Sequence, residues 1–202
     1  MVNKLHELLP AYVQDTENAE INYALAIEYE LIGQTATAIS FFLRAAERTD
    51  KLLLAYECML KIGLCFERQG KRGNSVRGAY LHAINILPGR PEAYFLLARF
   101  YERAGDHVFG YTYAQLGTLV PEGQKPLRSY VEYPGTYGLL FQKAVSAWWW
   151  GKSDESRKLF LEIWNRYTTM DDNHKNAVEK NLKQLNVPYV IREFHSNVEV
   201  IR

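Results

Sequence analysis

The residue types that usually carry out catalysis or hold metals are scattered along this sequence. Its histidines are far apart, and none lies at a metal-ligand interval from another or from a cysteine: His6, His82, His107, His174 and His195. The end of a phosphate-binding loop motif is matched by Gly151, Lys152 and Ser153. That motif also needs a glycine five residues before Gly151, where this sequence has Ser146. The sequence contains no nucleophile-elbow, zinc-protease or dinucleotide-binding motif. We therefore predict a protein that is not an enzyme and that needs no metal and no cofactor.

The two cysteines are Cys58 and Cys65, seven residues apart in a predicted helix. Their Cα atoms would be about 10 Å apart at roughly 1.5 Å rise per residue. A disulfide needs Cα atoms within about 7 Å. We therefore expect two free thiols, buried as small hydrophobic side chains.

Composition narrows the class of protein. With 202 residues and 48% hydrophobic content, the chain can fill a core of its own. Its 24 basic and 23 acidic residues leave a formal charge of +1, which favours neither nucleic acid nor an anionic membrane as partner. No apolar run is long enough to span a bilayer, and the first residues lack the apolar core of a signal peptide. We predict a cytoplasmic protein.

Three glycines mark an internal repeat. Gly33, Gly70 and Gly105 each end a similar segment, at intervals of 37 and 35 residues, and Gly151 is a fourth candidate. An aromatic residue stands four positions before each of the first three, and a small residue stands seven before. These positions share one helix face, so a second helix can approach closely at the small residue, and the glycine then ends the helix.

A second amphipathic stretch follows each glycine, so the elements pair as antiparallel helix hairpins. We predict an all-α fold, a stack of such hairpins forming an α-solenoid with a right-handed superhelix. The single domain spans 1–186, with an extended tail over 187–202. The hairpins are expected at about 18–50, 55–88, 91–120 and 136–168, with a closing helix at 172–185. The Pro-, Gly- and Tyr-rich connection between the third and fourth hairpins is expected to be an ordered loop packed on the stack.

The stretch "NYALAIEYELIGQTATAISFFLRAAERTD" resembles the tetratricopeptide repeat (TPR). The residues that match are Leu25, Ala26, Tyr29, Gly33, Ala38, Phe42 and Ala45. The second repeat departs from this pattern by one extra residue in "GKRGNSVRG", and the fourth has Ala147 where an aromatic is expected. The resemblance implies that the first helix of each hairpin lines a concave groove, which binds a peptide or a partner helix.

Carried over position by position, the resemblance gives candidate partner-binding residues. They are Tyr23, Ile27, Arg68, Phe95, Arg99, Glu102, Arg103, Phe141, Trp148 and Trp149. Two alternatives remain open at this point. In the second and third hairpins, the first helix ends in a pair of opposite charges. These charges form either a band along the groove or a solvated helix end. Part of the groove is available to the loop or to the C-terminal tail instead of a partner.

The run "SAWWWGKSDE" places three indoles side by side before Gly151. Successive helical residues point about 100° apart, so the three together sweep about 200° and do not form one platform. Trp148 and Trp149 fall at groove-lining places, whereas Trp150 is expected to pack towards the following helix or the tail.

A narrower resemblance concerns the third repeat and its surroundings. The chain resembles the helical module that follows the catalytic domain in bacterial and viral family-2-type glycosyltransferases. The matching residues are Arg90, Pro91, Glu92, Ala93, Tyr94, Leu97, Ala98, Arg99, Phe100, Tyr101, Gly105, Asp106, Tyr111, Gly117 and Pro121. The catalytic half of that family, with its nucleotide-sugar fold and D-x-D motif, has no counterpart here. The resemblance therefore implies a glycosylation-associated module without an active site of its own.

Three functions are compatible with these observations. The first is a non-catalytic protein-interaction module that binds a protein or peptide, with a glycosyltransferase as the implied partner. The second is an accessory subunit of a glycosyltransferase, whose tryptophans and loop tyrosines stack on sugar rings. The third is a structural component of a larger assembly that uses the tail for strand addition.

Overall fold

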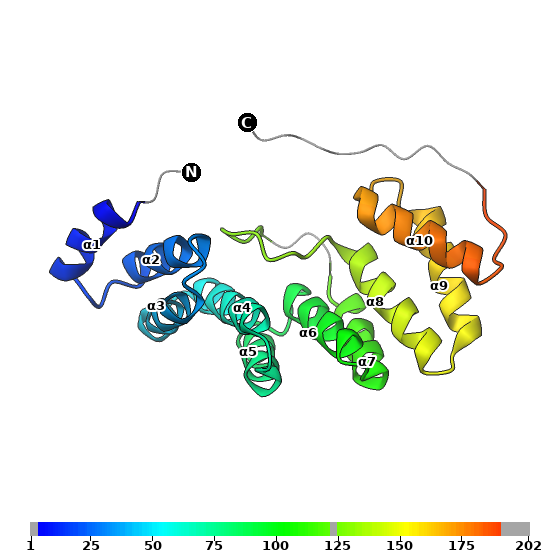
Figure 1. Cartoon of the computed structure of the whole chain (residues 1–202), viewed down its shortest axis with the longest axis horizontal. Helices are drawn as coiled ribbons and strands as arrows, with labels where there is room; N and C mark the ends of the chain where they lie inside the picture. Colours follow the sequence, from blue (N-terminus) through cyan, green and yellow to red (C-terminus); the bar gives the residue numbers. More distant parts are fainter. Residues whose placement is uncertain (1–3, 122–124, 191–202) are drawn as a thin grey trace. The chain divides into compact units, whose positions relative to one another are not determined.

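The computed structural model describes residues 4–121 and 125–190, and every regular element in these ranges is a helix (Figure 1). The chain divides into two compact units. Unit 1 holds the residues up to Ala93 together with the segment that ends at Val131. Unit 2 holds the residues from Tyr94 onwards, apart from that segment.

Unit 1 contains five whole helices. They are α1 (Leu5–Gln14), α2 (Ala19–Leu31), α3 (Thr35–Arg48), α4 (Leu52–Gln69) and α5 (Gly73–Ile86). Consecutive helices from α2 to α5 pack against one another. The small residues of the repeat permit this, since Ala26 and Ala38 are fully buried and Gly63 lies directly against the ring of Tyr80. The hairpin geometry of unit 1 therefore follows from the small residues that the spacing singled out.

Helix α1 lies ahead of the first predicted hairpin. It contains Pro10, which has no N–H to donate within the helix, so its stability depends on packing. The ring of Tyr12 meets Phe41 edge-on with centroids 5.4 Å apart, and the guanidinium of Arg44 donates to its hydroxyl. α1 also packs on α2. The contacts of Tyr12 with Phe41 and Arg44 come from more than 25 positions away in the sequence, which explains why local pattern did not reveal the helix.

Unit 2 contains the remaining helices. They are α6 (Glu92–Arg103, in unit 2 from Tyr94), α7 (His107–Thr118), α8 (Thr136–Trp149), α9 (Ser153–Arg166) and α10 (Asp172–Gln184). Gly110 lets α7 approach α6, because a Cβ there would lie 3.3 Å from the backbone nitrogen of Glu102. α8 packs on both α7 and α9, and α10 closes over α9. The core between them includes Phe160, Ile163 and Trp164.

The repeat glycines end their helices as predicted. Gly33, Gly105 and Gly151 all have φ near +80°, a region that favours glycine. After each of them, the next N–H donates to the carbonyl five residues back, which is the Schellman arrangement. Gly70 also has positive φ, but its ψ is 164°, so this helix end differs. The difference falls where the second repeat carries its extra residue.

Side-chain caps fix several helix starts. The Asn18 side chain accepts hydrogen bonds from two backbone N–H groups at the start of α2. The Asp171 side chain accepts one from the backbone N–H of His174 at the start of α10. Asp171 is therefore the N-cap of α10. Lys152 occupies the cap position of α9, and no side-chain cap bond forms there.

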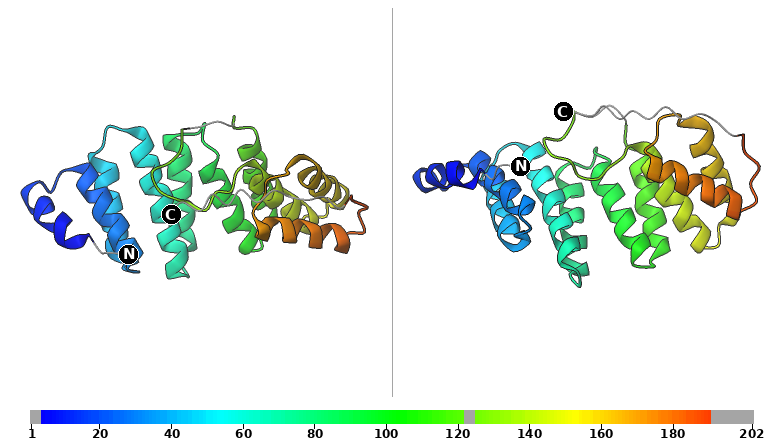
Figure 2. Two further views of the ribbon diagram at one scale, coloured as in Figure 1. Left: turned by 90° about the horizontal axis from the view of Figure 1, so that it is seen from above. Right: turned by 45° about the horizontal axis from the view of Figure 1, so that its top comes forward.

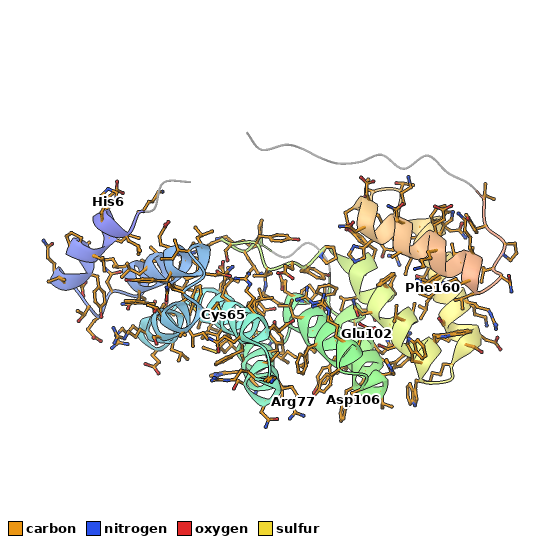
Figure 3. The ribbon with its side chains drawn as sticks, viewed as in Figure 1. His6, Cys65, Arg77, Glu102, Asp106 and Phe160 are labelled. Atoms are coloured by element: carbon orange, nitrogen blue, oxygen red, sulfur yellow. The ribbon has the colours of Figure 1, made fainter. Side chains whose placement is uncertain are left out.

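Both cysteines are free and buried, as predicted, and Figure 3 shows Cys65 among the helices of unit 1. None of the helices described here is long and apolar enough to cross a membrane. The predicted extended tail begins with 187–190, which have no regular structure, and its remainder lies outside the described residues.

Candidate partner-binding surface

Three glutamates repeat with the same spacing as the glycines. Glu20, Glu57 and Glu92 each stand thirteen residues before a repeat glycine, near the start of α2, α4 and α6, and all three belong to unit 1. Glu57 is fully buried and Glu92 is 6% exposed, whereas the Glu20 side chain is 44% exposed. We call these three residues the glutamate row. Buried carboxylates require hydrogen-bond donors, and some of the donors here come from another part of the chain.

Residues 125–131, which we call the covering segment, supply donors to Glu57 and Glu20. In Figure 2 it is part of the yellow-green stretch of chain that has no helix. Its side chains alternate: Leu127, Ser129 and Val131 are wholly or partly buried, whereas Arg128 and Tyr130 are exposed. The backbone bends at Arg128 and Ser129, so the covering segment lies on unit 1 as irregular, non-helical chain.

Glu57 is the central contact of the covering segment. Its Oε1 accepts hydrogen bonds from the Ser129 backbone N–H, the Ser129 hydroxyl and the Tyr23 hydroxyl, each at 2.6 Å. Its Oε2 accepts from the Arg128 backbone N–H at 3.2 Å. Burial, and then the neighbouring Glu57 carboxylate, raise the pKa of Tyr23, so the phenol stays protonated and donates. One buried carboxylate thus binds two successive backbone N–H groups and a hydroxyl of the same segment, where the backbone bends.

Glu20 binds the next donor of the covering segment. The Arg128 guanidinium approaches both carboxylate oxygens of Glu20, with Nη2 3.2 Å from Oε1. Lys51 approaches the same Oε1 at 2.9 Å. Hydrogen bonds from Arg128 and then from Lys51 lower the pKa of Glu20 to about 2. The Arg128 guanidinium also lies 5.9 Å from the centre of the Tyr23 ring, which adds a cation–π contact.

Glu92 acts on the covering segment through Arg90. The Arg90 guanidinium pairs with the Glu92 carboxylate, with Nε 3.1 Å from Oε2, and its Nη1 donates to the Lys125 carbonyl at 2.9 Å. Glu92 Oε2 also accepts from the Tyr56 hydroxyl at 3.0 Å. Because Arg90 is only 6% exposed, the ion pair holds its guanidinium in place to bind the backbone carbonyl.

A buried ion pair on α2 and α4 holds the end of the covering segment near Tyr130. Lys61 lies 2.7 Å from Glu30, and both side chains are less than a tenth exposed. Arg68 reaches the other oxygen of Glu30, also at 2.7 Å. Lys61 also donates to the Tyr130 carbonyl at 3.4 Å. The charge at the end of α4 therefore pairs across to α2, and does not stand as an isolated solvated group.

A pocket of about 370 Å³ opens beside the covering segment. It is lined by Lys4, Leu8, Tyr23, Ala24, Ile27, Glu28, Arg128 and Ser129. Its walls are contributed by α1, α2 and the covering segment itself. Apolar walls with a few polar groups at the rim are typical of pockets that bind a ligand side chain.

In unit 2 the groove-lining positions of α6 are likewise covered. Arg99 lies 2.7 Å from Glu132, and its guanidinium lies 5.6 Å from the centre of the Phe95 ring. Phe95 also meets Tyr133 with ring centroids 5.5 Å apart. Phe95 is 2% exposed and Arg99 is 7% exposed. The residues that follow the covering segment therefore occupy this part of the predicted groove.

The three consecutive tryptophans lie at the end of α8 with different surroundings. Trp149 is 65% exposed and its ring stacks on His107 at 5.8 Å. Trp150 meets Tyr111 of α7 at 5.2 Å, and the ammonium of Lys152 lies 3.8 Å from the centre of its ring. Trp148 is 37% exposed. The indoles diverge as the helical angle requires. The ring of Trp150 packs on Tyr111 of α7 and not on the following helix, whereas the Trp148 ring lies 5.8 Å from the Arg157 guanidinium of α9.

The predicted site residues separate into three sets. Tyr23, Phe95 and Arg99 are buried beneath chain that follows α7. Ile27, Phe141 and Glu102 are partly buried, and Phe141 packs between Phe160 and His174. The exposed set is Arg68, Arg103, Trp148 and Trp149. Their role in binding stays a prediction.

Glu57, Lys61 and Arg128 were missed by sequence reasoning. The signal for Glu57 was present, because the glutamate row has the 37- and 35-residue spacing of the glycines. Lys61 and Arg128 gave no such signal, since their partners Glu30 and Glu20 are defined only by the packing of α2, α4 and the covering segment.

Among the described residues, the metal-ligating side chains are dispersed and both cysteines are buried. Within 4–121 and 125–190, no group of three or more His, Cys, Asp or Glu side chains is arranged to hold a metal ion. Burial raises the pKa of the Cys65 thiol to about 11 and raises that of Cys58 as well, so neither forms a thiolate at neutral pH. At the start of α10, the His174 backbone N–H donates to Asp171, and the ring nitrogen Nδ1 of His174 lies 2.7 Å from the same carboxylate.

Comparison with solved structures identifies the fold. A crystal structure of MamA superposes with a TM-score of 0.65, at 17% identity, over 86% of this chain and 88% of that one. The fold is tetratricopeptide-like. A second MamA structure gives a TM-score of 0.61 at 17% identity over 93% of this chain and 86% of that one. YrrB, described as "a TPR protein with an unusual peptide-binding site", gives 0.62 at 14% identity over 89% of this chain and 84% of that one.

No family model matches the tetratricopeptide-like sequence, and no curated protein matches it either. At these identities the likeness to MamA and YrrB shows the fold alone. The expectation of an all-α, tetratricopeptide-like stack of helix hairpins is confirmed. The narrower resemblance to glycosyltransferase modules receives no support from these comparisons.

Proposed function

We propose that this protein is a non-catalytic protein-interaction module that binds a non-helical segment of a partner on the face formed by α2 and α4. One observation carries this proposal: that face already holds non-helical polypeptide, the covering segment, through Glu57 and Glu20. Side chains fixed on helices bind its backbone N–H and C=O groups, which is how a groove recognises a peptide largely independently of the peptide's side chains. The tetratricopeptide-like fold is shared with YrrB, whose description includes a peptide-binding site.

The test compares two charge insertions in the first hairpin. Ile27 on α2 is partly buried and lines the pocket, whereas Leu43 on α3 is 42% exposed and lies outside it. After a partner has been isolated from native extract and purified, its affinity is measured for the parent, Ile27→Glu and Leu43→Glu. We expect Ile27→Glu to weaken binding at least tenfold and Leu43→Glu to leave it unchanged. Equal affinity for all three proteins would remove the α2/α4 face from the proposal.

We further propose that the partner is a glycosyltransferase or its acceptor. The support is sequence alone, the run from Arg90 to Ala93 with the matching positions that follow it. The test is the identity of the isolated partner, and whether its turnover of nucleotide sugars changes when this chain is added. A partner with no such activity, and with no role as acceptor for one, would remove this narrower proposal while leaving the interaction module intact.

A second candidate function is sugar binding by the exposed tryptophans. Trp149 is 65% exposed and Trp148 is 37% exposed, and exposed indole faces can stack on sugar rings. Titration with oligosaccharides should then shift tryptophan emission in the parent but not in Trp149→Ala. Trp164 is 2% exposed and serves as the internal reference, because Trp164→Phe should leave any such shift in place. A structural role that uses the tail would involve residues beyond 190, which lie outside the described residues.

A further inference from the structure

The covering segment is held almost entirely by contacts that another peptide could make. Its backbone N–H groups at Arg128 and Ser129 donate to Glu57, and its carbonyls at Lys125 and Tyr130 accept from Arg90 and Lys61. Two side chains add specific contacts: the Arg128 guanidinium with Glu20 and the Ser129 hydroxyl with Glu57. Of the described residues in this segment only Val131 is fully buried, at 4% exposure.

From this arrangement we infer that the covering segment is an internal ligand that a partner displaces, and that the displacing partner is a non-helical peptide with an arginine followed directly by a serine or threonine. This inference rests on the proposed function, whose peptide-binding face it makes specific. The covering segment thereby blocks the face until a partner displaces it. Its contacts also show which peptide features the face recognises.

The preference for an arginine and a hydroxyl residue follows from the two carboxylates. Glu57 is fully buried, so it must keep its donors, and removal of the segment would leave it with only the Tyr23 hydroxyl among the contacts described above. An incoming peptide therefore has to supply N–H groups and a hydroxyl at the same places. Glu20 adds a requirement for a guanidinium, which binds a carboxylate through two parallel contacts as a lysine does not. An acidic residue at either place would meet a like charge.

Displacement is feasible because the segment lies between α7 and α8 without helix of its own and with few buried side chains. A tethered ligand competes at an effective concentration on the order of millimolar. A partner peptide of micromolar intrinsic affinity displaces the tethered segment when it makes contacts with the face that the segment does not make. The pocket beside Arg128 and Ser129 offers them, because its apolar wall at Ile27 and Leu8 is open to a further ligand side chain.

The experiment uses the segment's own sequence as the probe. A fluorescein-labelled peptide KPLRSYV, with blocked ends, is titrated by fluorescence polarisation against the full chain and its variants. One variant weakens the covering segment by Arg128→Ala with Ser129→Ala. A second replaces residues 125–131 by a glycine–serine linker of the same length, so that the result does not depend on one variant folding. Glu57→Gln is then added to each, and circular dichroism with thermal melting checks that all are folded.

We expect the probe to bind both opened variants at least tenfold more tightly than the parent. Adding Glu57→Gln should weaken that binding at least tenfold, and a probe with alanine in place of its arginine and serine should bind at least tenfold more weakly. Equal affinity for the parent and the folded opened variants would show that the segment does not compete. Undiminished binding of the alanine probe would show that the carboxylates do not select an arginine and a hydroxyl residue. Either result overturns the inference.

Failure here is distinguishable from failure of the proposed function. The partner assay compares Ile27→Glu with Leu43→Glu and does not use the probe. If the partner still depends on Ile27 while the probe shows no gain on the opened variants, the face binds partners and only the internal-ligand inference is lost. If the partner is indifferent to Ile27, the proposed function itself is lost.

Discussion

Two glycines on neighbouring helices should respond to the same substitution with opposite signs. Gly63 in α4 and Gly78 in α5 are both helical and both belong to unit 1. A Cβ added to Gly63 would lie 2.7 Å from Cδ1 and Cζ of the Tyr80 ring and closer still to Cε1. A Cβ added to Gly78 would meet nothing within 4 Å. The small residue that marks the repeat is thus required at Gly63 and not at Gly78.

The magnitudes follow from these distances. Alanine in place of glycine stabilises a helix interior by about 1 kcal/mol. At Gly78 this gain stands alone. At Gly63 the carbon–carbon contacts fall roughly 1 Å short of their optimum near 3.5–4.0 Å. Tyr80 is fully buried and its hydroxyl donates to Glu67, so the ring has no room to move. Overpacking of this kind costs up to about 3 kcal/mol, which leaves Gly63→Ala destabilised by about 2 kcal/mol net.

The assay is urea unfolding followed by circular dichroism, with thermal melting as a second measure. For a chain of this length 1 kcal/mol shifts Tm by about 2–4 °C, so we expect Gly63→Ala to melt about 4–8 °C lower and Gly78→Ala about 2–4 °C higher. In a Tyr80→Leu background, Gly63→Ala should lose most of its cost. A Gly63→Ala protein as stable as the parent would refute the close packing of α4 on α5 described above.

Three further predictions concern the charges and thiols of unit 1. Glu30→Ala should lower the free energy of unfolding by about 3–5 kcal/mol in urea titrations, because it leaves the Lys61 ammonium buried without its carboxylate; an effect below 1 kcal/mol would contradict the burial of that pair. Cys65, whose thiol pKa burial raises to about 11, should resist iodoacetamide at pH 8 in the native protein and react fully in denaturant, as measured by mass spectrometry. The carboxyl carbon of Glu20 should titrate near pH 2 by NMR, since the Arg128 guanidinium lowers its pKa from 4.5. Its contribution to stability is therefore complete above about pH 4.5 and is lost as the pH falls through about 2, and Arg128→Ala should move the midpoint back towards 4.5.

Much of the fold could be predicted because its signals are local. The aromatic, small and glycine positions around Gly33 and Gly105 define a helix face and a helix end within one or two turns, and the structure shows the expected positive φ there. The separation of Cys58 and Cys65 followed from helix geometry alone. Helix α1 was not predicted, because Pro10 weakens the local pattern and the stabilising contact of Tyr12 is with Phe41, far along the chain.

The candidate site was predictable only in part. Register placed Tyr23, Phe95 and Arg99 on the inner face of first helices, but it did not reveal that chain following α7 covers them. A non-helical segment without periodicity carries no information on which helix it will contact. Its position depends on donors and acceptors at Glu57 and Arg90 that lie 30 residues or more away in sequence.

The sequence by itself determined the all-α, tetratricopeptide-like stack of hairpins and where most of its helices end, because helix periodicity and glycine ends act over a few residues. It also contained the spacing of the glutamate row, from Glu20 to Glu92. Only the tertiary structure decided what those glutamates bind. Burial of Glu57 demands donors, and the covering segment supplies them at Arg128 and Ser129. The physical reason is that hydrogen-bond partners of a buried charge are selected by proximity in space, which sequence spacing does not specify.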